Sequence, residues 1–170
     1  YLDRDIDKFM TRTKKRATAT GRISSVLVIS YTALLGLLGT ALLIKFTTWW
    51  AVGLAVAGWI IYVVIYTPLK RMSVHGTIFG SIAGAVPPAV GYCAVTGRFD
   101  FAALLLILVL VFWQMPHFYA IAIYRKKDYA SADIPVLPIV LGKVAAQKYI
   151  TGAIDAFLSP ALRTTIKGST

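Results

Sequence analysis

The fold is decided by residues 23–44, ISSVLVISYTALLGLLGTALLI, which contain no charged side chain. A helix needs about 20 apolar residues to cross the roughly 30 Å hydrocarbon core of a bilayer. Three further uncharged, apolar stretches follow at residues 49–66, 77–96 and 101–124. We therefore expect an all-α protein, a polytopic transmembrane helical bundle with about four spans at these positions.

The composition excludes an ordinary soluble protein. Hydrophobic residues make up 58% of the 170-residue chain and charged residues only 15%, which is more apolar than a soluble domain. The net charge of +11 comes from basic residues gathered at the ends of the apolar stretches, without a basic-aromatic nucleic-acid module. The expected partner is the lipid bilayer, with no nucleic acid. The single cysteine, Cys93, excludes an internal disulfide.

The basic loops alternate along the chain and so predict the topology. Basic residues precede the first span and follow the second and fourth, whereas the two intervening loops contain only Lys45 and Arg98. Such loops stay on the cytoplasmic side, or on the matrix side in a mitochondrion. The acidic residues Asp3, Asp7 and Asp128 then lie on the same membrane face as most cations. We expect a bacterial inner membrane protein, with the mitochondrial inner membrane as the alternative.

The third span differs from its neighbours in having many small residues. Gly80 and Gly84 have the GxxxG spacing that allows helices to approach closely. Pro87 and Pro88 should break or kink the helix in mid-membrane, which is tolerated where the freed backbone groups face protein or a wet cavity. This span is therefore expected inside the bundle, either lining a site or serving as an ordinary packing helix.

An acidic cluster precedes the first span, in the sequence YLDRDIDK at residues 1–8. On a helix, Asp3 and Asp7 are four residues apart and share one face. A hard divalent cation would relieve their repulsion, and Mg²⁺ is commonly bound by one or two carboxylates plus substrate phosphates. Arg12 and Arg16, again four apart, are suited to bidentate contacts with phosphate oxygens. The alternative is a solvated, charged helix end.

A second acidic cluster follows the fourth span, with Lys127 and Asp128 near its start and Asp133 five residues later. Either cluster alone is weak evidence for a site. Because the topology puts both on one membrane face beside Lys and Arg side chains, together they are typical of a site for pyrophosphate and Mg²⁺. The other end of such a substrate would be lipid-soluble.

His117 lies within the fourth span. If this span stays helical, residues 117, 121, 124 and 128 share one face, and His117 lies about 16 Å deeper than Asp128. An ionisable side chain within a span is a functional candidate, and imidazole is a common ligand of heme iron. The alternative is a histidine that hydrogen-bonds to a neighbouring helix. His75, in a basic loop, is explained by exposure.

Several motifs resemble those of one family. The sequence DRDID at residues 3–7, with Met10, Arg12, Thr13 and Arg16, resembles the first aspartate motif of the UbiA-type intramembrane prenyltransferases. Supporting stretches are YTPLKR at 66–71, GAVPP at 84–88, GYCAVTG at 91–97, WQMPHF at 113–118, KDY at 127–129 and IPVLP at 134–138. The strings WQMPH and IPVLP resemble the branch that farnesylates heme, the heme O synthases. The resemblance covers roughly residues 1–150.

This resemblance implies a cytoplasmic-side active site in a nine-helix bundle, with Mg²⁺ as the cofactor. It implies that Asp3, Asp7 and Asp128 bind the metal and act in catalysis. The implied substrate-binding residues are Arg12, Arg16, Lys70, Arg71, Lys127 and His117. The implied reaction transfers a farnesyl group from farnesyl diphosphate to a vinyl group of heme B, forming heme O. The alternatives are polyprenyl transfer to an aromatic ring, as in quinone biosynthesis, and a non-enzymatic membrane transporter or assembly subunit.

The chain departs from the family pattern in three places. The leading Asn of the first motif would lie four residues before Asp3, outside this sequence. Asp128 and Asp133 are five residues apart instead of four, so Asp133 is not assigned as a ligand. The first two and the last two or three of the nine helices are not recognisable. We expect residues 1–143 to be a partial prenyltransferase domain, inactive alone, and residues 144–170 to be a divergent or truncated tail.

Overall fold

The computed structural model describes residues 1–142, 144–152 and 155, and every regular element in this part of the chain is helical. The elements are α1 (Arg4–Asp7), α2 (Ser25–Phe46), α3 (Trp49–Ile60), the π-helical segment η1 (Ile61–Tyr66), α4 (Thr67–Met72), α5 (Gly76–Thr96), α6 (Phe101–Tyr124), α7 (Lys126–Ser131) and α8 (Leu137–Val140). Residues 144–152 are also helical.

Among the described residues, four helices are long and apolar enough to cross a membrane: Ser25–Phe46, Trp49–Met72, Gly76–Thr96 and Phe101–Tyr124. The predicted fold class, an all-α polytopic bundle with about four spans, is confirmed, and the chain is an integral membrane protein. The second span is longer than the predicted 49–66, because the helix continues through η1 and α4 to Met72. The helix itself therefore carries the basic residues at its end.

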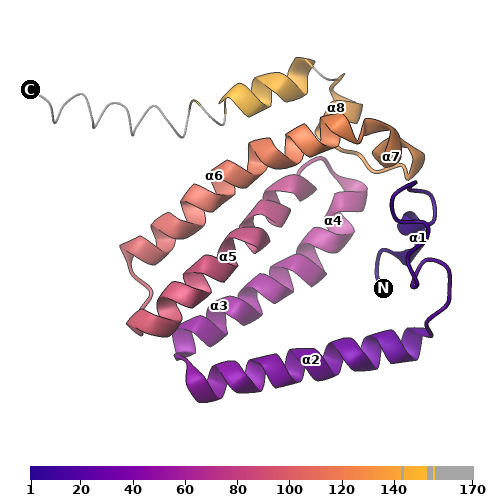
Figure 1. Cartoon of the computed structure of the whole chain (residues 1–170). Helices are drawn as coiled ribbons and strands as arrows, with labels where there is room; N and C mark the ends of the chain where they lie inside the picture. The colour runs from indigo at the N-terminus through magenta and orange to yellow at the C-terminus, as the bar shows by residue number, and fades with distance from the viewer. Residues whose placement is uncertain (143, 153–154, 156–170) are drawn as a thin grey trace, which may run out of the picture.

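The centre of the bundle is α5, which packs against α3, η1 and α4 on one side and against α6 on the other (Figure 1). Small residues permit the close approach. A Cβ at Gly84 of α5 would lie 2.4 Å from Oε1 of Gln114 on α6, and a Cβ at Gly58 of α3 would lie 3.0 Å from the Val86 side chain. The expected position of the third span, inside the bundle, is confirmed.

Pro87 and Pro88 do not break α5, contrary to one of the two predicted outcomes. The helix runs from Gly76 to Thr96 with both prolines inside it. Proline removes one backbone hydrogen bond and crowds the preceding turn. In a membrane the packing of neighbouring helices offsets that loss, so an interior proline is tolerated.

The first span, α2, stands away from the other three (Figure 1). Among the described helices its backbone approaches only α3, Ser25 at its start accepts a hydrogen bond of 3.1 Å from Arg4 of α1, and none of its residues is buried. Three of its hydroxyls are satisfied within the helix, because Ser30, Thr32 and Thr40 each donate a hydrogen bond to the carbonyl one turn earlier. Ser24 caps its N-terminus by accepting a hydrogen bond from the backbone N–H of Leu27.

The loop between α5 and α6 is organised by Asp100, the N-cap of α6. Its Oδ1 accepts hydrogen bonds from the N–H groups of Ala102 and Ala103, and its Oδ2 accepts one of 2.9 Å from the Tyr92 hydroxyl. Arg98 Nε lies 3.0 Å from the same Oδ2. Desolvation raises the pKa of Asp100, but the hydrogen bonds from Tyr92, Ala103 and Ala102 and the Arg98 charge outweigh it, so the pKa lies below its ordinary value.

At the opposite end of the bundle, segments distant in sequence meet. The region around α1 lies beside α7 (Figure 1), and Ser131 Oγ donates a hydrogen bond of 3.1 Å to the Phe9 carbonyl. The two acidic clusters therefore lie at the same end of the bundle, as the alternation of basic loops predicts. In residues 144–152, Ala146 is buried with Tyr119 and Leu137. The predicted tail is otherwise outside the described residues, except for position 155.

Candidate active site

A cavity of about 210 Å³ lies at this end, between the α1 region, α4, α5, α6 and the segment that follows α7. Five of the nine predicted site residues line it: Asp3, Asp7, Arg12, Arg16 and Lys70. Apolar residues, including Met10, Phe118, Ile121, Ala122 and Ile134, form another part of the lining. The cavity thus joins a charged rim to an apolar wall.

Asp3 is paired with the cations of α4. Its Oδ2 contacts Lys70 Nζ, and its Oδ1 lies 3.5 Å from Arg71 Nη2, which also donates to the Leu2 carbonyl. The turn from α4 to α5 holds Lys70 in place, because a Cβ at Gly76 would lie 2.7 Å from Lys70 Cα, so only glycine fits there. Two predicted diphosphate ligands therefore lie beside a predicted metal ligand.

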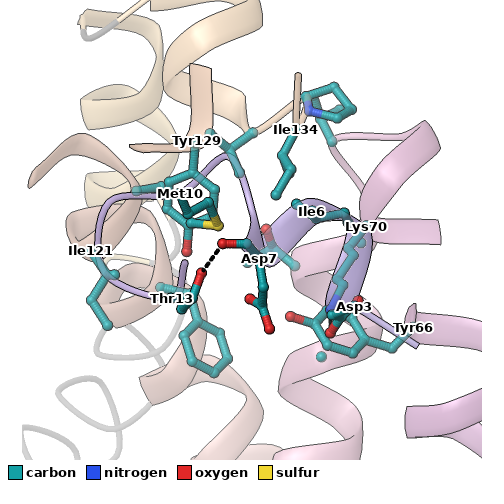
Figure 2. Close-up of a pocket in the computed structure, with 18 of the residues that line it drawn as sticks. Asp3, Ile6, Asp7, Met10, Thr13, Tyr66, Lys70, Ile121, Tyr129 and Ile134 are labelled. Carbon is teal, nitrogen blue, oxygen red and sulfur yellow. Dashed lines mark hydrogen bonds and ion pairs between the residues drawn. The ribbon is translucent and has the colours of Figure 1, made fainter. Parts of the chain in front are cut away.

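Asp7 is buried at the end of α1, with a side chain only 10% exposed. Arg16 Nη1 lies 3.1 Å from its Oδ2 and 3.3 Å from its Oδ1. Thr13, itself buried, donates a hydrogen bond of 3.1 Å to the Asp7 carbonyl (Figure 2). The Asp7 N–H donates to the Asp3 carbonyl at 2.9 Å, which is the predicted helical spacing. Both carboxylates therefore line the same cavity (Figure 2).

Tyr66 forms part of the cavity wall at the end of η1. The segment ends at Thr67, whose N–H and Oγ1 both donate to the Tyr62 carbonyl, the hydroxyl at 2.9 Å, and the next residue, Pro68, has no N–H to donate. The Tyr66 ring packs directly on Gly80, where a Cβ would lie 2.8 Å from the ring, and Lys70 Nζ lies 5.2 Å from the ring centroid. Short π-helical segments are frequent at functional sites.

Lys127 and Asp128 do not line this cavity. They line a separate, more open hollow beside α7. The expected common face of residues 117, 121, 124 and 128 is not formed, because α6 ends at Tyr124 and α7 begins at Lys126. Tyr129, next in the chain, does reach the cavity. The structure therefore brings Asp3 and Asp7 together and leaves Asp128 at the same end, outside their cavity.

His117 is exposed on α6 and is not among the residues that line the cavity. Other residues of α6, including Phe118 and Ile121, line it. Its ring stacks on Trp113, with centroids 5.2 Å apart and an interplanar angle of 11°. In the part of the chain that the structure describes, His117 makes no hydrogen bond to a neighbouring helix, which was the alternative explanation for this residue. Its predicted contact with heme stays a prediction.

The residues present fit Mg²⁺ that is shared with a substrate phosphate. Asp3 and Asp7 supply hard carboxylate oxygens to one cavity, and Mg²⁺ usually binds one or two carboxylates together with substrate phosphates. Within the described residues, no group of three or more His, Cys, Asp or Glu side chains is close enough to hold a metal ion. The donor set therefore suits a metal that arrives with its phosphate ligand, and not a cage made by protein alone.

The chain matches the model of the UbiA prenyltransferase family over residues 1–166. The chain belongs to this family. The predicted resemblance is thereby confirmed. The match to the family continues beyond residue 143, where a divergent or truncated tail is predicted to begin.

Curated relatives are similar along almost the whole chain. The protoheme IX farnesyltransferase of Yersinia pseudotuberculosis serotype O:1b is 49% identical over 169 residues, which cover 99% of this chain and 57% of the relative. The proteins of the same name from Yersinia enterocolitica serotype O:8 and Photorhabdus laumondii are 48% and 47% identical, with 57% and 58% of each relative covered. The chain therefore spans little more than half the length of these relatives. No solved structure matches the chain.

The cavity contains further residues that sequence reasoning did not assign to the site. Thr13, Phe118 and Ile134 lie within motifs that resemble the UbiA family, but nothing in their own chemistry marks them out. A helical signal was available for one of them. Phe118, Ile121 and Ala122 have the i, i+3, i+4 spacing of a single helix face, and all three line the cavity.

Proposed function

We propose that the protein transfers a farnesyl group from farnesyl diphosphate to a vinyl group of heme B, forming heme O. The observation that carries this proposal is the cavity in which Asp3, Asp7 and three cationic side chains meet an apolar wall. Such a cavity suits a molecule with a charged diphosphate at one end and a hydrocarbon chain at the other. Membership of the UbiA prenyltransferase family and the name of the curated relatives support the choice of reaction.

The diphosphate would be bound by Arg12, Arg16 and Lys70. Arg12 makes no ion pair within the described part of the chain, so its guanidinium is available for phosphate oxygens. Arg16 and Lys70 instead neutralise Asp7 and Asp3. When diphosphate enters, these two cations exchange a carboxylate for a phosphate partner, which leaves both carboxylates free to bind a metal.

Asp3 and Asp7 would hold Mg²⁺, which neutralises charge that develops on the diphosphate as the leaving group departs. The bound cations add to the same stabilisation. Both cations already lie at the cavity before substrate enters, since the tight turn at Gly76 fixes the backbone of Lys70 and Arg16 pairs with Asp7. Preorganised charges of this kind lower the barrier without having to reorient during the reaction.

The apolar wall would protect the reactive hydrocarbon. Met10, Phe118 and Ile121 line the same cavity as the charged side chains. Departure of diphosphate leaves an allylic cation, which bulk water would destroy. Side chains without polar groups exclude water from this part of the cavity and so favour reaction with the vinyl carbon of the acceptor.

The roles of four other residues are proposed from the family resemblance. Asp128 would contribute to metal binding, and Lys127 and Arg71 to diphosphate binding. His117 would contact heme, and its flat stacking on Trp113 provides an extended aromatic surface on α6 against which a porphyrin fits. Each proposal predicts a change in metal dependence, diphosphate affinity or heme absorption when the residue is replaced.

We further propose that the protein resides in the bacterial inner membrane, with the cavity on the cytoplasmic side. The basic residues at the cavity end of the bundle favour this orientation. The relatives named above come from bacteria with such a membrane. The residues up to 143 would form part of a prenyltransferase domain, and the protein's activity would require the rest of that domain.

The test compares two acceptors with the full-length enzyme in detergent or lipid vesicles. The enzyme is incubated with farnesyl diphosphate, Mg²⁺ and either heme B or a hydroxybenzoate, and the products are identified by mass spectrometry. We expect heme O from heme B and no prenylated benzoate. A prenylated aromatic ring would replace the heme proposal with a role in quinone biosynthesis. Absence of diphosphate release with either acceptor would refute prenyl transfer.

A further inference from the structure

Gln114 is a buried polar side chain that the proposed mechanism does not use. It lies in the middle of α6, inside an otherwise apolar span, and is only 9% exposed. Within the described residues it makes no hydrogen bond, although a primary amide has two donors and an acceptor. No fully buried side-chain nitrogen or oxygen in the described residues lacks a hydrogen-bond partner, so the amide atoms of Gln114 remain accessible from outside the helix contact. A small polar molecule that reaches them would supply the hydrogen bonds that the apolar span does not.

The Gln114 amide packs against Gly84 of α5, a position where the helix has no side chain. A Cβ at Gly84 would fall 2.4 Å from Gln114 Oε1 and 3.2 Å from Nε2, so the amide occupies the space that any larger residue would fill. The same face of α5 continues with exposed Pro87, Pro88 and Gly91. Gln114 therefore contacts α5 at Gly84, the first of these exposed positions.

Backbone groups at this position also lack partners. Pro87 and Pro88 have no N–H, so the carbonyls of Ala83 and Gly84, four residues earlier, lose their usual helical donors. The Gly84 carbonyl, which lacks its usual donor, thus belongs to the residue on which the Gln114 amide packs. A buried water molecule typically forms about three hydrogen bonds to groups of this kind.

This polar position is next to the cavity. Gly80 of α5 and Phe118 of α6 line the cavity, and Gly84 and Gln114 are four residues farther along the same two helices, away from the charged rim. Four residues of α-helix rise about 6 Å. A group bound at Gln114 would therefore lie just beyond the cavity wall, on the side away from the diphosphate.

We propose that Gln114 and the Gly84 carbonyl bind the water molecule that supplies the hydroxyl group of the product. The inference rests on the proposed heme farnesylation. In that reaction the farnesyl carbon bonds to the terminal vinyl carbon as diphosphate leaves, and the positive charge moves to the vinyl carbon next to the porphyrin. The water oxygen bonds to this carbon and releases one proton, which yields the hydroxyethyl group. Gln114 is thus a positioning residue, acting through the water.

Without a positioned water, the same cation has a second outcome. It loses a proton from the neighbouring carbon and forms an alkene, lighter than the hydroxylated product by the mass of one water molecule. The ratio of hydroxylated to dehydrated product therefore reports on the water alone. It does not depend on the amount of enzyme that folds, because both products arise from the same intermediate.

The experiment measures this ratio by mass spectrometry, with full-length enzyme, farnesyl diphosphate, heme B and ¹⁸O-labelled water. Gln114→Met keeps the length of the side chain but cannot hold the water, and we expect the ratio to fall roughly tenfold, as for the loss of one hydrogen bond to the attacking oxygen. Gln114→Glu keeps an oxygen acceptor and is expected to retain the hydroxylated, ¹⁸O-labelled product.

A matched pair of variants tests the site from the α5 side. Gly84→Ala displaces the Gln114 amide and should lower the ratio in the same way, whereas the added Cβ of Gly91→Ala meets nothing within 4 Å and should leave the ratio unchanged. An unchanged ratio in both Gln114→Met and Gly84→Ala, at any level of total activity, would mean that Gln114 only packs the two helices. If the wild-type enzyme makes no farnesylated heme, the proposed function fails instead.

Discussion

The burial of Asp7 allows a sharp comparison with Asp5 on the same short helix. The Asp7 side chain is 10% exposed and lines the cavity, whereas the Asp5 side chain is 66% exposed and, among the described residues, pairs only with Arg4 and Lys8 at 3.5 and 3.9 Å. We expect Asp7→Asn to abolish most of the Mg²⁺-dependent release of diphosphate from farnesyl diphosphate. Asp5→Asn is expected to leave release near the wild-type level.

The structure indicates that stability and activity respond differently to this change. Two unit charges 3.1 Å apart, the separation of Arg16 Nη1 and Asp7 Oδ2, attract by roughly 5 kcal/mol at an effective dielectric constant of about 20. The Arg16 side chain is 54% exposed, so solvent screening reduces the net value of the pair to about 1 kcal/mol or less. Loss of a preorganised charged group from a catalytic site typically lowers the rate about 10²–10³-fold.

The assay measures diphosphate release by the full-length enzyme at saturating Mg²⁺, with thermal unfolding of each variant as the control for folding. The expected result is a rate about 10²–10³-fold lower for Asp7→Asn, with a melting temperature within a few degrees of wild type. Release within about twofold of the wild-type rate would refute the assignment of Asp7 to the site. A large loss of stability would refute the small energy assigned to its pair with Arg16.

Three further predictions concern other parts of the chain. Gly80→Ala should push the Tyr66 ring into the cavity and raise KM for farnesyl diphosphate severalfold, because its Cβ would lie 2.8 Å from the ring; Gly36→Ala, with nothing within 4 Å, is the control, and equal KM values would contradict the packing. Asp128→Asn should raise the Mg²⁺ requirement about tenfold, and an unaltered requirement would remove Asp128 from the metal site. Asp100 has a lowered pKa, so it stabilises the fold above its ordinary pKa of about 4 and loses this contribution as the pH falls through the folded-state value. Wild type should therefore lose melting temperature in acid more steeply than Asp100→Asn, which keeps a good N-cap; parallel acid profiles would contradict this.

The spans and their arrangement were predictable because they follow from one strong physical constraint. Uncharged, apolar stretches of about 20 residues have few alternatives to a membrane helix. The alternation of basic loops then predicts on which side of the membrane each helix end lies. The predicted fourth span, 101–124, coincides with α6, and the small residues of α5 correctly predicted its central position. The extension of the second span to Met72 was missed, because Pro68 and Lys70 suggest a helix end.

The site was predictable only where local spacing determines it. Asp3 and Asp7 share a cavity because they are four residues apart, and the helical hydrogen bond between them confirms this spacing. The position of Asp128 depends instead on the break between α6 and α7, which no periodicity in the sequence marks. The pairing of Asp3 with Lys70 joins residues 67 positions apart and requires the tertiary fold.

The isolation of α2 has a consequence for the synthesis of the protein. The hydroxyls of Ser30, Thr32 and Thr40 are bonded to its own backbone, and none of its residues is buried against another described helix. A helix whose backbone and mid-span hydroxyls are satisfied internally is stable in lipid as an independent unit, whereas association of helices is a separate, later step. During biogenesis α2 is therefore able to leave the translocon and settle in the bilayer before α3, α5 and α6 have assembled.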